Sequence, residues 1–164
     1  VIVSGAIMPW PGGLGAQYKV LGSSVGGAAV TPVLTAFVQP MNTDGVVRSI
    51  FAPQPVPEGY LEHIGPGLSL RRGTLRANAR QVNNLRPHLV TMAARYPEIT
   101  LPVEMIHGDI DTIVGLKVHA EQALPLLENG ALTVLEGIGH MPQHVREGAV
   151  IEAIHRAAGK ARLR

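Results

Sequence analysis

Cysteine is absent from the 164-residue sequence, and charged and aromatic residues are scarce. Without cysteine the chain forms no disulfide, uses no thiol nucleophile and holds no metal through thiolates, and its compartment is left open. Charged residues make up 16% of the chain, the net charge is +2, and no basic run stands out beyond the C-terminal "GKARLR". Such a short tail is typical of a solvated end, so we expect no nucleic-acid partner. No apolar run approaches the roughly 18 residues of a membrane span.

Apolar residues make up 46% of the chain, which is enough for a packed core in a single domain. The chain opens on Val1 rather than Met, and its first six residues already have the pattern of a buried strand. We therefore expect further sequence upstream, where any targeting signal would lie. A cytoplasmic location is our working expectation.

Three short apolar segments predict buried β-strands: "VIVSGA" (1–6), "PVEMIHGD" (102–109) and "ALTVLEGIGH" (131–140). Continuous apolar strands suit a parallel sheet that helices cover on both faces. Helical apolar spacing over 115–130 and 142–160 predicts a connecting helix and a closing helix. The fold class is therefore α/β. Three strands are fewer than the about 4–6 of an ordinary sheet, so we expect part of the sheet to be missing from this chain.

The region between the first two predicted strands has a different pattern. Proline and glycine clusters alternate there with helical patches, of which 74–96 is the longest. Within it, only "VVRSIF" (46–51) could be a strand. We expect this region to be mostly helical, with long connections.

Polar side chains follow two of the predicted strands. Asp109 and Asp111 come after the second strand, and His140 and His144 come after the third. Ligands of open α/β sheets bind beyond the carboxyl ends of the strands. A carboxylate that accepts the Nδ1 proton of a histidine fixes the tautomer of the ring and supports the imidazolium form. The pattern predicts that Asp111 and His140 form two of the three groups of a catalytic triad.

Residues 97–145 resemble the C-terminal part of the α/β-hydrolase fold family. The pattern G-x-x-D-x-x-V, which follows the seventh strand of that family, is matched by Gly108, Asp111 and Val114. The pattern G-x-G-H, which follows the eighth, is matched by Gly137, Gly139 and His140. The resemblance implies a hydrolase that cleaves an ester or a related bond, with Asp111 as the triad acid and His140 as the general base.

The resemblance extends to the rest of the chain. "VIVSGA" resembles the sixth strand of the family, and the helical region resembles the cap, or lid, inserted after it. We thus expect a core portion at 1–8 and 97–164, with a cap at 9–96. The nucleophile, either a serine or an aspartate, and the oxyanion hole would lie upstream of Val1, on the missing part of the sheet or on a partner chain, and the isolated chain would be inactive. No cofactor is implied.

The apolar and aromatic residues of the inserted region bear on the substrate. They suggest a small molecule with an apolar acyl or ring group, and they fit the core of the cap equally well: Ile7, Met8, Trp10, Tyr18, Phe37, Phe51 and Tyr60.

Ser24 offers an alternative nucleophile, because Gly22-Ser23-Ser24-Val25-Gly26 matches G-x-S-x-G. A nucleophile elbow needs a buried strand before the serine and a helix after it, but "QYKVL" makes a poor central strand. We therefore interpret the match as a small-residue segment of a cap helix. If Ser24 were catalytic, the chain would be a minimal hydrolase. A further alternative is a non-catalytic hydrolase-like module, whose open sheet edge beside 1–6 would recruit a partner.

The site residues also have structural alternatives. Asp111 could cap the helix that starts near Leu116, and His140 could be an ordinary turn histidine. Asp109 fits a turn or a supporting role, and His107 a packed polar position. Three of the other histidines fit solvated positions at or near helices: His119, His144 and His155. His63 and His88 lie in the expected cap, where they could face the substrate but fit surface or core packing better. A zinc site at "HMPQH" is disfavoured, because Pro142 interrupts the helix and H-E-x-x-H is absent, so we expect no metal.

Overall fold

The computed structural model describes residues 1–13, 16–33, 43–68 and 71–162. Their contacts divide the chain into two compact units. The first unit consists of Val1–Trp10, Ser49–Pro55 and Leu89–Arg164, and the second of Pro11–Arg48 and Val56–His88. Residues 49–55, which the sequence analysis assigned to the inserted region, thus belong by their contacts to the first unit. The expected boundaries of a cap remain a prediction.

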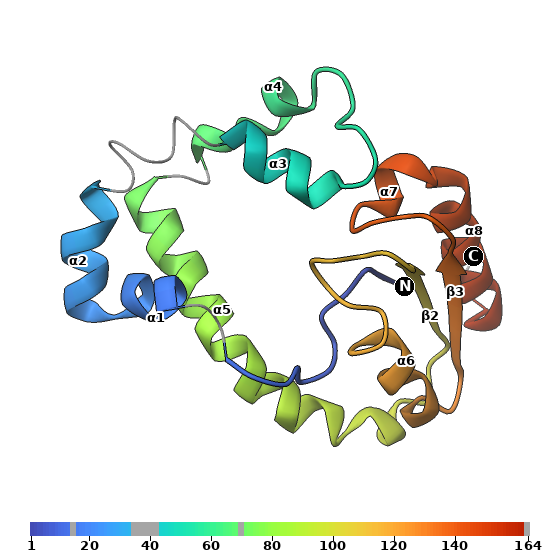
Figure 1. The fold of residues 1–164 in the computed structure, drawn as a ribbon. Coiled ribbons are helices and arrows are strands. Elements are labelled where there is room, and N and C mark those ends of the chain that lie inside the picture. The colour runs from blue at the N-terminus through green and yellow to red at the C-terminus, as the bar shows by residue number, and fades with distance from the viewer. Residues whose placement is uncertain (14–15, 34–42, 69–70, 163–164) are drawn as a thin grey trace. The chain divides into compact units, whose positions relative to one another are not determined.

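The first unit contains a parallel sheet of three strands in the order β1–β2–β3 (Figure 1). The strands are β1 (Ile2–Val3), β2 (Val103–Gly108) and β3 (Gly130–Leu135). The register places Ile2 opposite Met105 and Val103 opposite Gly130. The α/β class and the small parallel sheet expected from the apolar runs are confirmed.

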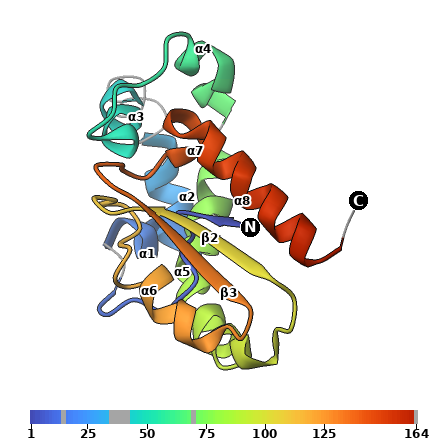
Figure 2. The same cartoon turned by 90° about the vertical axis from the view of Figure 1, so that its right-hand side faces the viewer.

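Helices cover both faces of this sheet (Figure 2). On one face lie α6 (Ala120–Ala123) and a 3₁₀ turn at Leu124–Leu126, and on the other lies α8 (Glu147–Lys160). Successive side chains of a strand point to opposite faces, so β2 directs side chains toward the helices on both faces of the sheet. The main apolar cluster comprises Met8, Ala93, Tyr96, Met105, Leu116, Ala120, Ala123 and Leu127.

A buried carboxylate holds α8 against the sheet. Glu104 of β2 accepts hydrogen bonds from Nε of Arg156 at 3.1 Å and from Nζ of Lys160 at 2.7 Å. Arg156 also donates to Oγ1 of Thr133 on β3, at 3.2 Å. Burial alone would raise the pKa of the Glu104 carboxyl, but the hydrogen bonds and positive charges of Lys160 and Arg156 outweigh burial and lower it.

The two helices predicted near the sheet are shorter than expected. Over 115–130 only α6 and the 3₁₀ turn form, because Pro125 has no N–H to donate and its ring interferes with a continuing α-helix. The closing helix is divided into α7 (Pro142–Val145) and α8, since Arg146 takes a non-helical φ of −139°.

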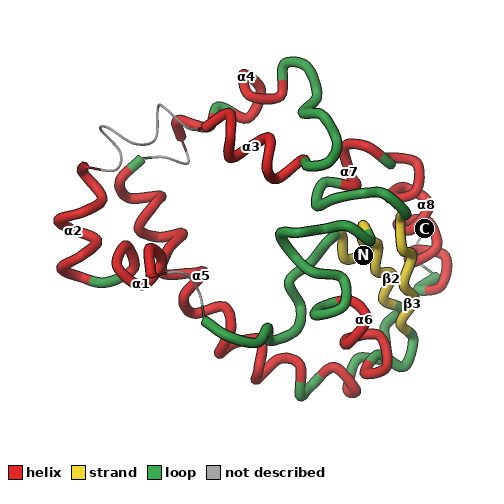
Figure 3. The backbone as a smooth tube through the Cα atoms, viewed as in Figure 1, coloured by secondary structure: helices red, strands yellow, loops and turns green. Residues whose placement is uncertain are grey.

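Between β1 and β2 the described residues form only helices, turns and loops (Figure 3). The α-helices are α1 (Ala16–Gly22), α2 (Ser24–Val33), α3 (Thr43–Phe51), α4 (Tyr60–Ile64) and α5 (Arg72–Ala93). The strand suggested for 46–51 was wrong, because this stretch ends α3. Val47 and Phe51, four positions apart, are 7% and 1% exposed, whereas Val46 is 51% exposed. That is the burial period of a helix.

Candidate active site

Asp111 lies in the turn that follows β2, and its carboxylate is fixed by local bonds. Oδ1 accepts the backbone N–H groups of Ile113 at 2.9 Å and Val114 at 2.8 Å. An aspartate that bonds the backbone two and three positions ahead stabilises a turn. The alternative that Asp111 caps a helix starting near Leu116 was wrong, because α6 starts only at Ala120 and its N-cap residue is His119. The bonds of Oδ1 fix the turn, and Oδ2 is left available to a second partner.

That partner is His140, which follows β3. Its Nδ1 lies 2.9 Å from Oδ2 of Asp111, across 29 positions of sequence. The structure thus brings the two predicted site residues together. An ionised carboxylate can only accept, so Nδ1 carries the hydrogen, and Nε2 of the neutral ring keeps a lone pair for a proton. The Asp111 side chain is 0% exposed and that of His140 is 23% exposed, so the ring alone reaches solvent.

The packed polar position expected for His107 is confirmed, but its contact with the carboxylate of Asp111 was not predicted. His107 is a buried residue of β2, and its Nε2 lies 3.3 Å from Oδ2 of Asp111 and 2.7 Å from the carbonyl oxygen of Val114. Both neighbours are acceptors, so Nε2 of His107 must carry a hydrogen. The sequence signal that could have indicated this contact is a polar residue, His107, within an otherwise apolar strand and four positions before Asp111.

The charge of Asp111 is strongly favoured. Burial alone would raise the pKa of its carboxyl. Hydrogen bonds from His107, His140 and the backbone of Val114 outweigh burial and hold the pKa well below its ordinary value. Asp111 is therefore ionised throughout the neutral range, which is the state that accepts the Nδ1 hydrogen of His140.

Two glycines of the matched motifs allow the two loops to meet. A Cβ built on Gly108 would lie 2.1 Å from the carbonyl oxygen of Ile138, so only glycine lets the histidine loop cross the end of β2. A Cβ on Gly139 would lie 2.0 Å from the carbonyl oxygen of Ala52. Atoms this close would collide, so each motif glycine reflects a close approach of backbone to backbone.

Asp109 links the same two loops. Its Oδ1 accepts the N–H of Gly137 at 2.7 Å, and its own N–H donates to Leu135 at 3.1 Å. The next residue, Ile110, donates to the carbonyl of Ile138 at 3.2 Å. The supporting role considered for Asp109 thus takes the form of a bond to the turn that presents His140.

Ser24 lies in a different setting. It is the exposed first residue of α2, and the residues before it form α1 rather than a strand. Ser23 caps the start of α2: its Oγ accepts the N–H of Gly26 at 3.0 Å and donates to Val20 at 2.8 Å. A nucleophile elbow joins a strand to a helix. The interpretation of this motif as part of a helical segment is confirmed.

His119 departs from the solvated position considered for it. The residue is 5% exposed, its Nδ1 accepts the N–H of Met8 at 3.2 Å, and its ring packs edge-on against Trp10. Burial, together with the nearby ring of His107, lowers the pKa of the His119 imidazole. The apolar turns around Leu116 draw this side chain inward. His144 and His155 are exposed, as considered.

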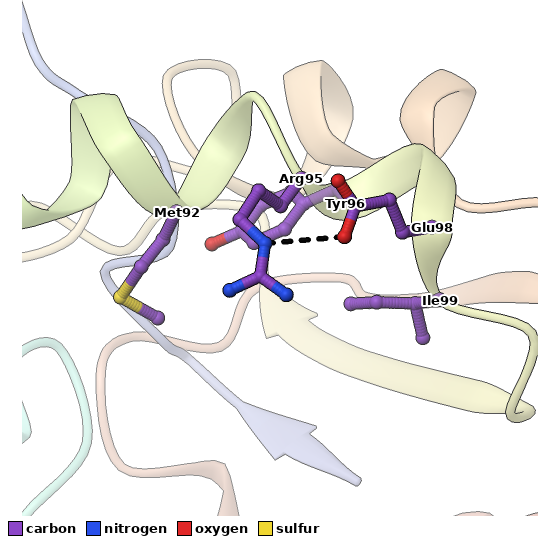
Figure 4. Close-up of a pocket in the computed structure, with 5 residues that line it drawn as sticks. All are labelled: Met92, Arg95, Tyr96, Glu98 and Ile99. Atoms are coloured by element: carbon purple, nitrogen blue, oxygen red, sulfur yellow. Dashed lines mark hydrogen bonds and ion pairs between the residues drawn. The ribbon is translucent and has the colours of Figure 1, made fainter.

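The aromatic and apolar residues weighed as substrate contacts have mixed positions. Met8 and Phe51 are buried, Ile7, Trp10, Tyr18 and Tyr60 are half-buried, and Phe37 lies outside the described residues. A separate hollow of about 290 Å³ is lined by Met92, Arg95, Tyr96, Glu98 and Ile99 (Figure 4). Its polar groups include an ion pair between Arg95 and Glu98, 3.1 Å apart. This hollow contains neither Asp111 nor His140.

Two further features bear on the function classes considered. Among the residues with described positions, no three histidine, aspartate or glutamate side chains are grouped as a metal site requires. Across the same residues, no helix combines the length and hydropathy needed to cross a bilayer.

Comparisons with known proteins identify the fold. No family model matches the sequence, and no curated protein matches it. Solved structures do match: the bromoperoxidase of Bacillus anthracis has a TM-score of 0.56 at 18% identity, over 77% of this chain and 47% of its own. An esterase of Exiguobacterium antarcticum has a TM-score of 0.53 at 20% identity, over 78% and 46%. Lip1 of Acinetobacter baumannii AYE has a TM-score of 0.57 at 17% identity, over 94% and 52%.

The described structure therefore has part of the α/β-hydrolase fold. The chain spans about half the length of the structures it matches. The resemblance inferred from the glycine, aspartate and histidine motifs is confirmed at the level of the fold.

Proposed function

We propose that this chain contributes the acid and the base of a hydrolase that cleaves an ester or a related bond. The observation that carries the proposal is the 2.9 Å contact between Oδ2 of Asp111 and Nδ1 of His140 at the carboxyl edge of a parallel sheet. A buried, ionised carboxylate that fixes the tautomer of a half-exposed imidazole is the arrangement that general-base catalysis requires.

The chemistry follows from the tautomer. Where the nucleophile is a serine hydroxyl, Nε2 of His140 takes its proton, and the serine oxygen then attacks the carbonyl carbon of the substrate. Asp111 stabilises the imidazolium that results, and Nε2 returns the proton to the leaving alcohol. A water molecule, activated in the same way, releases the acyl group. No cofactor takes part in these steps.

The nucleophile in this proposal lies upstream of Val1, on sheet strands beside β1 or on a partner chain. The helical setting of Ser24 and the half-length match to hydrolase-fold structures support this assignment. The substrate in this proposal is a small apolar molecule, and the location is cytoplasmic.

The first experiment measures p-nitrophenyl ester hydrolysis by the 164-residue chain. We expect no turnover. A burst of product that disappears in the Ser24→Ala variant would instead make the chain a minimal hydrolase.

The second experiment uses the longer protein encoded with the upstream sequence. The His140→Ala and Asp111→Asn variants should lose on the order of 10³-fold or more in kcat. The His155→Ala variant, which changes an exposed histidine of α8, should keep the full rate and serves as the control. Hydrolysis at the normal rate without His140 would refute the proposal.

A further inference from the structure

The segment Ser49–Pro55 contacts the turn that presents His140. The side-chain amide of Gln54 uses both of its ends there: Oε1 accepts the N–H of Gly139 at 2.9 Å, and Nε2 donates to the carbonyl of Gly137 at 2.7 Å. These two backbone groups lie on either side of Ile138, immediately before His140. Gln54 and Gly139 are 85 positions apart in sequence, yet both belong to the first unit.

Two more contacts of the same segment flank His140. On the N-terminal side, the carbonyl of Ala52 lies against Gly139 so closely that it leaves no room for a side chain. On the C-terminal side, the ring of Phe51, which is 1% exposed, lies 5.5 Å from the ring of His144 between centroids. The segment therefore holds the chain before His140 and after it.

The bonds of Gln54 add to two others that fix this turn. The N–H of Gly137 goes to Asp109, and the carbonyl of Ile138 accepts from Ile110. The carbonyl of Gly137 and the N–H of Gly139 are the groups that Gln54 takes. Glycine has no side chain to pack and a backbone with wide conformational freedom, so its position here depends on hydrogen bonds. Removing the amide takes one backbone hydrogen bond from each of these two glycines.

We propose that Gln54 is a positioning residue for His140. It acts through the backbone of Gly137 and Gly139, and it fixes the approach of the Nδ1–H group to Asp111. The role of His140 as a base, which this positioning would serve, rests on the proposed function. The segment between β1 and β2 in sequence thereby supplies part of the support of the acid–base pair.

The test follows signals of the pair itself in the ¹⁵N-labelled 164-residue chain. The variants are Gln54→Ala, which removes both bonds, and Gln54→Glu, which keeps an acceptor for Gly139 but loses the donor to Gly137. Gln122→Ala is the matched control, because Gln122 is an exposed glutamine of α6. NMR measures hydrogen exchange of the Gly139 amide and of the His140 Nδ1 proton, relative to sheet amides such as that of Ile106.

In Gln54→Ala we expect the Gly139 amide and the His140 Nδ1 proton each to exchange about tenfold faster than in the unchanged chain, relative to Ile106. In Gln54→Glu the Gly139 amide should stay protected while the His140 proton exchanges faster. Gln122→Ala should change neither. A merely structural role for Gln54 would accelerate all three groups together and leave their ratios unchanged.

An unchanged His140 proton in Gln54→Ala overturns the proposal. If Gln54→Ala does not fold, Gln54→Glu decides alone, and an unchanged His140 proton there has the same meaning. These signals are read without substrate, so they test Gln54 independently of hydrolysis. The proposed function fails by a different result, namely ester hydrolysis that survives the loss of His140.

Discussion

Nε2 of His107 lies 3.3 Å from Oδ2 of Asp111, the same carboxylate oxygen that meets His140. The Asp111 carboxylate therefore has two histidine partners and two backbone partners, and the side chain is fully buried. These donors explain why the buried carboxylate of Asp111 keeps its charge, because each of them stabilises the ionised form.

The first prediction concerns His107→Ala. Removing this donor should raise the pKa of Asp111 from its lowered value toward the ordinary range, because burial still opposes the charge. ¹³C NMR of the aspartate carboxyl carbons over a pH titration measures the change. His155→Ala is the control and should leave the Asp111 titration in place. An identical Asp111 titration in both variants would show that His107 does not stabilise the carboxylate.

The second prediction concerns the pH dependence of folding. Because the pKa of Asp111 is lower in the folded chain than in the unfolded chain, its stabilising effect is fully present above about pH 4 and is lost as the pH falls further. Asp111→Asn should therefore lower the free energy of unfolding at pH 7, by about 1–3 kcal/mol. The difference in free energy of unfolding between this variant and the unchanged chain should become smaller as the pH falls below about 4. Urea unfolding from pH 7 to pH 2.5 tests this, and a difference that stays constant would contradict it.

The third prediction concerns the anchor of α8. Glu104→Gln removes the negative charge of the carboxylate to which Arg156 and Lys160 both donate. We therefore expect a loss of about 1–3 kcal/mol in the free energy of unfolding. Glu152→Gln is the matched control, because Glu152 is 76% exposed and lies 4.0 Å from Arg156. That change should stay within about 0.5 kcal/mol. Urea unfolding at pH 7 compares the two, and equal effects would refute the role of Glu104.

The fourth prediction contrasts two glycines. Gly139→Ala places a methyl group against the carbonyl of Ala52, so we expect a loss of about 1–3 kcal/mol in stability. Gly148→Ala fills open space on α8 and should be neutral or stabilise by up to about 1 kcal/mol. Thermal unfolding of both variants measures the difference. A Gly139→Ala variant as stable as the unchanged chain would mean that the segment containing Ala52 does not press on this loop.

Local pattern was sufficient to predict the sheet and the pairing of Asp111 with His140. The strand at 102–109 is apolar and ends at Gly108. Gly108 and Gly139 stand where backbone approaches backbone closely, and Gly137 takes a positive φ of 67°. Each of these positions requires glycine, so each leaves a mark in the sequence.

Other features depend on contacts that no local pattern records. Gln54 stands in a proline-rich loop, and only the fold brings it to the histidine turn. The stretch 46–51 has β-branched residues that favour a strand, yet burial of Val47 and Phe51 on one helix face decided its structure. The apolar spacing over 115–130 predicted one long helix. Pro125 cannot continue an α-helix, so α6 ends before it and a 3₁₀ turn follows.

The contacts of Gln54 also have a consequence for how the chain folds. A bond between residues 85 positions apart closes a long loop, and its entropic cost must be met before the bond stabilises anything. Strand pairing between β2 and β3 spans a much shorter stretch and can form earlier. We therefore expect the orientation of His140 to be among the last features to form, so that a partly folded chain pairs β2 with β3 before Asp111 and His140 are aligned.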